Sequence, residues 1–193
     1  MTKTRKVAVI VGSLRKESLN RKAALALRNL APDGVELEIV EIGDLPHYDE
    51  DAEAAGAPAQ WVRFREQVRA SDAVLFVTPE YNRSVPGALK NAIDVGSRPY
   101  GASVFAGRPA AVMSVSQGAI GGFGANHHLR QSLVFLDMPV LPQPEAYVGG
   151  AGSLFAANGD IAQDGTRGFF QSFIDAFAGW IERNASPQEA SHG

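Results

Sequence analysis

The sequence predicts an α/β fold in which a five-stranded parallel sheet lies between two layers of helices. Strand-like and helix-like segments alternate along nearly the whole chain of 193 residues, without a repeat or a linker-like stretch. The segments 7–11, 73–77 and 110–115 are almost continuous apolar runs, which are typical of strands buried on both faces of a parallel sheet. The alternation and these runs together indicate repeated strand–helix–strand units with right-handed crossovers.

Two further segments have the pattern of edge strands. In the segment 35–42, apolar residues alternate with Glu36 and Glu38, as expected of a strand with one face in water. The segment 138–148 contains three prolines, and proline is tolerated at the edges of sheets but not at their centres. Among the doubly wound strand orders, 2-1-3-4-5 places the second and fifth strands at the edges. The predicted fold is therefore a flavodoxin-like three-layer sandwich.

Apolar residues at helical spacing fill the segments between these strands. The stripes are Ala23-Leu27-Leu30, Trp61-Phe64-Val68, Leu89-Ile93, Leu129-Leu133-Leu136 and Phe169-Phe173-Phe177-Trp180. Pro86 lies where the start of the third helix favours proline. The aromatic stripe near the C-terminus is expected to pack in the core rather than to bind a ligand. The segment 47–51, which includes His47, is predicted to be a turn and not an acid–base site.

Composition sets the expected class and location of the protein. The formal net charge of −3 offers no basic surplus for binding nucleic acid, and the lack of cysteine excludes disulfides and thiol chemistry. The N-terminal apolar run stops at Gly12, which is too short for a signal sequence or a membrane span. We expect a cytoplasmic protein with no nucleic-acid or membrane partner. One domain is predicted over 1–184, followed by a disordered tail over 185–193.

The loop after the first predicted strand has the composition of a phosphate site. It opens on Gly12 and leads into a helix N-terminus, whose backbone N–H groups and dipole favour an anion. Ser13, Ser18 and Asn20 can donate hydrogen bonds to phosphate oxygens, and Arg15 can offset part of the phosphate charge. Helix capping by a serine or asparagine is the simpler alternative, and it is compatible with phosphate binding. The further glycines of a dinucleotide fingerprint or a P-loop are absent, so the loop suits the terminal monophosphate of FMN.

Two more loops leave the carboxyl ends of predicted strands, where ligands bind in such folds. The loop after the third strand has an aromatic, a carboxylate and an amide beside a rigid proline, and can hold the edge of a flat heteroaromatic ring. An ordinary proline-rich turn is the alternative interpretation. The loop after the fourth strand is rich in glycine, which lets backbone N–H groups approach a ligand closely. Glycine loops of this kind also occur without a ligand.

The three loops carry motifs that resemble a known family. They read V-G-S-L-R-x-x-S-x-N, then T-P-E-Y-N-x-S-x-P-G-x-L-K-N-A-I-D, then S-x-G-x-x-G-G. In this order and spacing the chain is similar to the NADPH-dependent FMN reductase family, and in particular to its quinone-, azo-dye- and chromate-reducing branch. The resemblance implies bound FMN, NADPH or NADH as the electron donor, and small acceptors such as quinones, free flavin, azo compounds or chromate. It also implies a homodimer or homotetramer.

The resemblance further implies which residues hold the cofactor. The FMN phosphate would be bound by Ser13, Arg15, Ser18 and Asn20. The isoalloxazine ring would lie against Pro79, Glu80, Tyr81, Asn82 and Ser84, with Ser116, Gly118, Gly121 and Gly122 near its other polar edge.

The chemistry in this hypothesis belongs to the cofactor, so no side chain is expected to act as an acid, a base or a nucleophile. No metal site is expected either, because the adjacent His127 and His128 on a predicted helix point in different directions. Two alternatives stay open. In the first, the chain would be a one-electron carrier of the flavodoxin type. In the second, it would be a nucleotide-binding regulatory module without a redox role.

Overall fold

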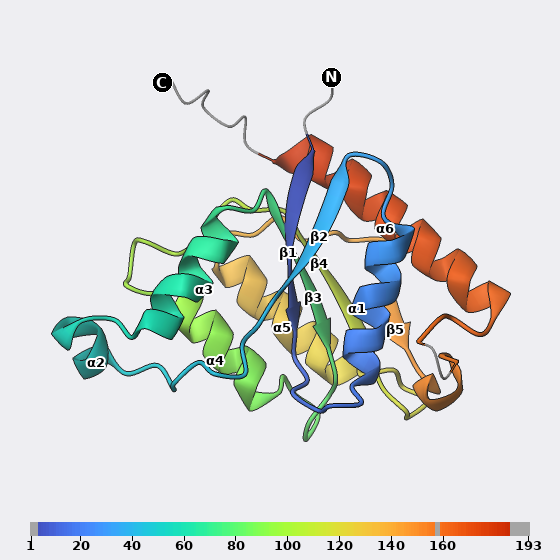
Figure 1. Ribbon diagram of the computed structural model, residues 1–193, viewed down its shortest axis with the longest axis horizontal. Coiled ribbons are helices and arrows are strands. Elements are labelled where there is room, and N and C mark those ends of the chain that lie inside the picture. The colour runs from blue at the N-terminus through green and yellow to red at the C-terminus, as the bar shows by residue number, and fades with distance from the viewer. Residues whose placement is uncertain (1–3, 157–158, 186–193) are drawn as a thin grey trace.

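The computed structural model describes residues 4–156 and 159–185, and it has the three layers expected from the sequence (Figure 1). Its sheet has five strands in the order β2-β1-β3-β4-β5, and every neighbouring pair is parallel. The predicted fold class and strand order are therefore confirmed. Of the predicted tail, only Ala185 lies within the described residues.

The bounds of the elements follow the predicted segments closely. The strands are β1 (Arg5–Val11), β2 (Val35–Val40), β3 (Ala73–Thr78), β4 (Ala110–Val115) and β5 (Ala146–Val148). The helices are α1 (Leu19–Leu30), α2 (Glu50–Ala55), α3 (Ala59–Arg69), α4 (Gly87–Gly96), α5 (Phe123–Phe135) and α6 (Asp164–Asn184), with a short 3₁₀ turn η1 (Ala151–Ser153). In the described part of the chain, no helix combines the length and apolarity needed to cross a bilayer.

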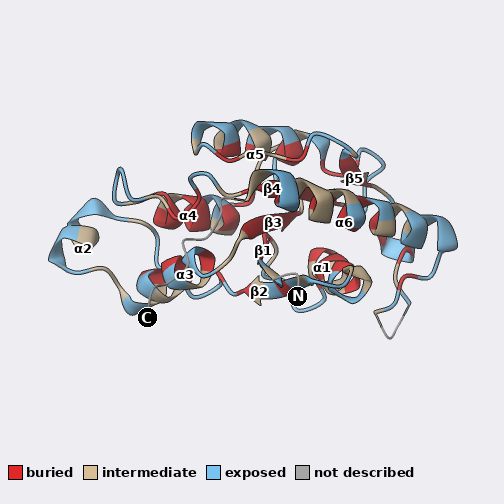
Figure 2. Ribbon diagram, turned by 90° about the horizontal axis from the view of Figure 1, so that it is seen from above, coloured by how far each residue is buried: buried red, intermediate tan, exposed pale blue. Residues whose placement is uncertain are grey.

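Alternate residues of the central strands face different helix layers. In β1, Val7, Val9 and Val11 pack in one apolar cluster with α1 and α6. Ala8 and Ile10 pack in a second cluster with α3, α4 and α5. Figure 2 shows the same division, with the buried residues of the helices on the sides that face the sheet. Burial on both faces explains why these strands are continuous apolar runs in the sequence.

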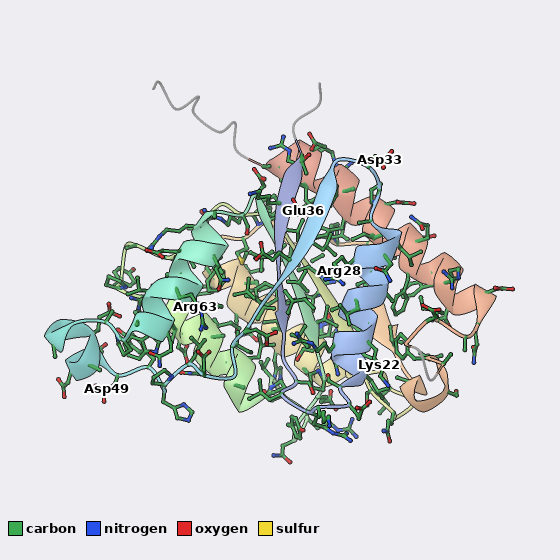
Figure 3. All side chains as sticks on the ribbon, viewed as in Figure 1. Lys22, Arg28, Asp33, Glu36, Asp49 and Arg63 are labelled. Carbon is green, nitrogen blue, oxygen red and sulfur yellow. The ribbon has the colours of Figure 1, made fainter. Side chains whose placement is uncertain are left out.

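The edges of the sheet are as predicted, although the fifth strand is shorter than the segment 138–148. On β2, Glu36 lies on the solvent side of the strand (Figure 3). At the other edge, Val140 forms an isolated bridge with Ala110, and β5 begins only at Ala146. Two prolines lie between these points, and proline has no N–H to donate to a neighbouring strand. The segment therefore pairs at its two ends and not in its middle.

Helix α2 corrects the end of the turn predicted over 47–51, because residues 47–49 lie in a loop and Glu50 and Asp51 begin the helix. The Asp49 side chain caps this helix by accepting hydrogen bonds from the backbone N–H groups of Asp51 at 2.8 Å and Ala52 at 3.3 Å. None of the α2 residues is buried, so the sequence has no apolar stripe that would reveal the helix. Its N-terminal cap and its acidic first turn are the local signals that favour it.

A nearly buried ion pair holds α2 against the rest of the molecule. Arg65 on α3 donates to both carboxylate oxygens of Glu53, at 2.9 and 2.5 Å, and its Nε donates to the Val95 carbonyl at 2.9 Å. The exposed fractions of the two charged side chains are 5% for Arg65 and 19% for Glu53. The hydrogen bonds from Arg65 hold the pKa of the Glu53 carboxyl below its usual value. The pair thus connects α2, α3 and the end of α4.

Replacing Glu53 by glutamine is expected to lower the free energy of unfolding by about 2 kcal/mol near neutral pH, because a buried guanidinium then loses its charged partner. The pKa of Glu53 is lower in the folded than in the unfolded state. The ion pair therefore stabilises the fold fully above the ordinary glutamate pKa of 4.5, and this stabilisation is lost as the pH falls through the pKa of Glu53 in the folded state. Urea unfolding of the wild type, Glu53→Gln and the exposed control Glu50→Gln, at about pH 7 and about pH 3, measures it. A penalty for Glu53→Gln that is the same at both pH values would contradict the assignment.

Candidate functional site

The three predicted loops lie together at the carboxyl edge of the sheet, which is its lower edge in Figure 1. Strand register brings them together, because Val11 is opposite Val77 and Thr78 is opposite Ser114. The Gly12 N–H also donates to the Val77 carbonyl at 2.9 Å. A methyl group on Gly12 would lie 2.8 Å from the Thr78 hydroxyl oxygen, so the first two loops can only approach this closely with glycine there.

The first loop presents a row of free backbone donors at the start of α1. Ser18 caps the helix, and its hydroxyl oxygen accepts from the Arg21 N–H at 3.1 Å. Within the described residues, no backbone N–H between Ser13 and Asn20 donates to another group. The Arg15 side chain is exposed and forms no ion pair with any described residue. Free N–H groups, a helix dipole and an unpaired cation together form a site for an anion.

Asn20 connects this loop to the fourth strand. The side chain is buried, with 4% exposed, and its amide group donates to the Val115 carbonyl at 3.2 Å. Its carbonyl oxygen, Oδ1, is buried without a hydrogen-bond partner among the described residues. An amide that holds a strand end in this way has one hydrogen left for a ligand, and its orphaned oxygen requires a donor such as a hydroxyl group. Both features fit a ligand that carries phosphate and hydroxyl groups.

The second loop is a tight hairpin. The backbone groups of Tyr81 and Ser84 exchange two hydrogen bonds, at 3.1 and 2.8 Å. The two residues between them, Asn82 and Arg83, have φ of 48° and 62°. Positive φ at both central positions is the turn type that favours Asn-Gly, because glycine adopts this conformation without steric cost. Arg83 therefore occupies a position that suits glycine.

The ion pair of Arg83 joins an exposed cation to a largely buried carboxylate. Arg83 donates to Glu80 at 3.1 Å, and the exposed fractions of the two side chains are 71% for Arg83 and 12% for Glu80. A residue other than glycine in the left-handed region costs roughly 1–2 kcal/mol. Arg83 therefore keeps a conformation that glycine would adopt at a lower cost.

Glu80 joins the hairpin to α5. One carboxylate oxygen accepts from Arg83, and the other accepts from the Ala125 N–H at 3.1 Å, in the first turn of α5. The Ser84 hydroxyl and His128 Nδ1 form a second link to this helix at 3.0 Å. Of the residues predicted to contact the flavin ring, Pro79, Glu80 and Ser84 are half-buried, whereas Tyr81 and Asn82 are exposed.

In the third loop, two of the predicted glycines are required by packing. Gly121 has φ of 66°, and a methyl group there would lie 2.6 Å from the Tyr147 carbonyl carbon. Gly122 has φ of 77° and would bring a methyl group 3.0 Å from the Ser114 Cβ. Gly118 differs from both, because it is exposed. A methyl group added there would meet only the Ser116 hydroxyl, at 3.6 Å. Of these three glycines, only Gly118 has open space in front of it.

Asn91 lies in the motif of the second loop, but we did not predict a role for it in the site. This residue on α4 is buried, and its amide group donates to the carbonyl groups of Leu45 and Pro46, at 3.3 and 2.9 Å. Its carbonyl oxygen accepts from the Tyr48 N–H at 2.9 Å. Asn91 thus fixes the loop after β2 against α4, beside a 460 Å³ pocket. Its place in the motif of the second loop is the sequence signal that could have identified it.

The adjacent histidines of α5 contact different partners. His127 Nε2 lies 2.9 Å from the Tyr147 hydroxyl, and the two rings stack. His128 instead faces Ser84 in the hairpin. Burial, together with a hydrogen bond to Glu145, raises the pKa of Tyr147 to about 12.

Known proteins are similar to this chain over nearly its whole length. The family model described as NADPH-dependent FMN reductase matches residues 5–153. A quinone reductase from Pseudomonas putida is 66% identical over 184 residues, which cover 95% of this chain and 98% of that protein. A 2-hydroxy-1,4-benzoquinone reductase from a Burkholderia species is 45% identical over 176 residues, covering 91% of this chain and 96% of that protein.

A solved structure agrees with these sequence comparisons. FerB, described as a flavoenzyme NAD(P)H:(acceptor) oxidoreductase from Paracoccus denitrificans, superposes with a TM-score of 0.90 at 44% sequence identity. The superposition covers 95% of this chain and 100% of that one.

Replacing Gly121 by alanine is expected to lower the free energy of unfolding by about 2–4 kcal/mol, because overpacking against Tyr147 adds to the cost of its positive φ. The matched control Gly118→Ala is expected to change it by less than about 0.5 kcal/mol, since its surroundings are open. Urea unfolding of both variants without added ligand measures the difference. Equal stabilities of the two variants would show that packing does not require glycine at 121.

Proposed function

The chain belongs to the NADPH-dependent FMN reductase family and is an oxidoreductase, and from this premise we propose that it reduces quinones through FMN held by the loops after β1, β3 and β4. The observation that carries the proposal is the row of N–H groups between Ser13 and Asn20, which donate to no described residue, next to Arg15, which forms no ion pair with one. The quinone class is proposed because two similar proteins are named as quinone and benzoquinone reductases. We propose free flavin, azo compounds and chromate as further acceptors.

The residues of the first loop fit the phosphate end of FMN. Backbone N–H groups and the α1 dipole would hold the phosphate, and Ser13 and Arg15 would add side-chain donors. Ser18 caps the helix while its own N–H stays available. The orphaned Oδ1 of Asn20 would accept from a hydroxyl group of the ribityl chain. The predicted phosphate residues therefore divide into donors to the phosphate and residues that hold the loop.

The other two loops fit the flat ring. Exposed Tyr81 and Asn82 lie on one side, on a hairpin fixed by Glu80. On the other side, the backbone N–H groups of Gln117, Ala119 and Ile120 donate to no group in the described residues. Donors fixed in place before reaction stabilise negative charge as it develops on a polar ring edge. When bound, FMN accepts a hydride from NADPH or NADH and passes two electrons to the acceptor.

We propose a homodimer or homotetramer, in agreement with the expectation from the sequence. The C-terminal end of α5 exposes Val134 and Phe135, which are 69% and 79% exposed. Next to them, Ile93 and Leu136 line a 610 Å³ groove between α4 and α5. A second copy of the chain would cover this apolar surface. Sedimentation that gives the single-chain mass of 20.5 kDa at micromolar concentration would reject the assembly. The cytoplasmic location stays a prediction.

The absorption spectrum of the pure protein, recorded before and after NADPH is added without oxygen, tests the proposed function. We expect a flavin spectrum that NADPH or NADH bleaches and that a benzoquinone restores. A flavin spectrum that neither donor changes would favour the one-electron carrier. A colourless protein that takes up no added FMN would favour the regulatory module.

Replacing Arg15 by alanine is expected to weaken FMN binding by roughly 10- to 150-fold, because a hydrogen bond to a charged group contributes about 1.5–3 kcal/mol. Binding of riboflavin, which lacks the phosphate, should stay the same. Fluorescence titration of the apoprotein with each flavin measures both affinities, and Lys16→Ala is the matched control for loss of a neighbouring exposed cation. Equal losses for FMN and riboflavin would rule out the phosphate contact.

A further inference from the structure

We propose that Arg83 is a specificity-determining residue, whose guanidinium binds a phosphate group of the nicotinamide dinucleotide donor. The inference rests on the proposed function, because the donor must reach a flavin beside this hairpin. The phosphate belongs either to the pyrophosphate, which NADH and NADPH share, or to the 2′-phosphate, which only NADPH carries.

The backbone of Arg83 is the first observation behind this proposal. Arg83 has φ of 62° at the tip of a two-residue hairpin, where glycine would be free of strain. A residue other than glycine adopts this conformation only at a steric cost. Strained residues of this kind persist where the surrounding structure holds them and where a function uses them.

The surroundings of Arg83 provide the restraint. The hairpin is attached to α5 on both sides of the turn, through Glu80 to Ala125 and through Ser84 to His128. Between these links, a methyl group on Gly124 would lie only 2.7 Å from the Arg83 carbonyl oxygen, so the turn packs directly on the helix. The backbone that carries the guanidinium is therefore held in one place at the edge of the site.

The charge of Arg83 is available to a reactant. Its side chain is 71% exposed, and its ion-pair partner within the described residues is Glu80. The second carboxylate oxygen of Glu80 accepts from the Ala125 N–H, so α5 holds this carboxylate independently of Arg83. The cofactor phosphate is assigned to Arg15 on the first loop. Arg83, on the neighbouring loop, offers an exposed cation to an anionic group of the second molecule.

The alternative is that Arg83 only stabilises the hairpin through Glu80. The two interpretations predict opposite effects of Arg83→Gly on folding. If Arg83 is structural, the variant loses an ion pair and unfolds more easily. If the strain is maintained for function, the variant relieves it and unfolds at a higher urea concentration, while donor recognition is lost.

The test compares the wild type, Arg83→Gly and Arg83→Lys with three hydride donors: NADPH, NADH and the phosphate-free N-benzyl-1,4-dihydronicotinamide. For Arg83→Gly, we expect the KM for the phosphate-bearing donor, relative to that for the benzyl compound, to rise about tenfold. A rise with both nucleotides assigns the pyrophosphate, and a rise with NADPH alone assigns the 2′-phosphate. Arg83→Lys, which keeps the charge and the strained position, should retain most of the recognition.

Urea unfolding of the apoproteins gives a readout that needs no cofactor. We expect the midpoint to rise for Arg83→Gly and to stay near the wild-type value for Arg83→Lys. A KM ratio unchanged by Arg83→Gly, or a lower unfolding midpoint for this variant, would overturn the proposal. A wild-type protein that none of the three donors reduces would instead reject the proposed function and this inference with it.

Discussion

Parallel pairing of β1, β3 and β4 is the constraint on which the site depends. Because parallel strands end at the same edge, the loops that follow three separate strands are brought together by register alone. Each of these strands is buried on both faces, by α1 and α6 on one side and by α3, α4 and α5 on the other. The same apolar packing that stabilises the fold therefore fixes the positions from which the loops start.

Within this frame, the residues of the loops divide into those that hold the structure and those that remain free for a ligand. Asn20 and Glu80 are bound to other elements, and Gly121 is required by close contact with Tyr147. Among the described residues, the side chains of Arg15 and Tyr81, the N–H groups between Ser13 and Asn20 and those of Gln117, Ala119 and Ile120 have no partner. A binding site of this kind needs both groups, because donors act strongly only when other residues hold them in place beforehand.

The hairpin after β3 shows how these two roles come into conflict. Its two links to α5 stabilise one conformation of the turn, and that conformation places Arg83 in a region of φ that arginine disfavours. This turn type favours glycine there. Positions where local preference and tertiary structure disagree are concentrated at functional sites, since function is what keeps the unfavourable residue.

The sequence by itself determined the fold class, the order of the strands, both sheet edges and the loop with a phosphate-binding composition, because burial and turn chemistry leave local patterns. Only the tertiary structure decided the rest. Helix α2 depends on Arg65, a residue of another helix, and it has no apolar stripe. The length of β5, the clamp formed by Asn91 and the positive φ of Arg83 likewise depend on partners distant in the chain. Such partners leave no periodic pattern, because contacts between distant segments are set by how the layers pack.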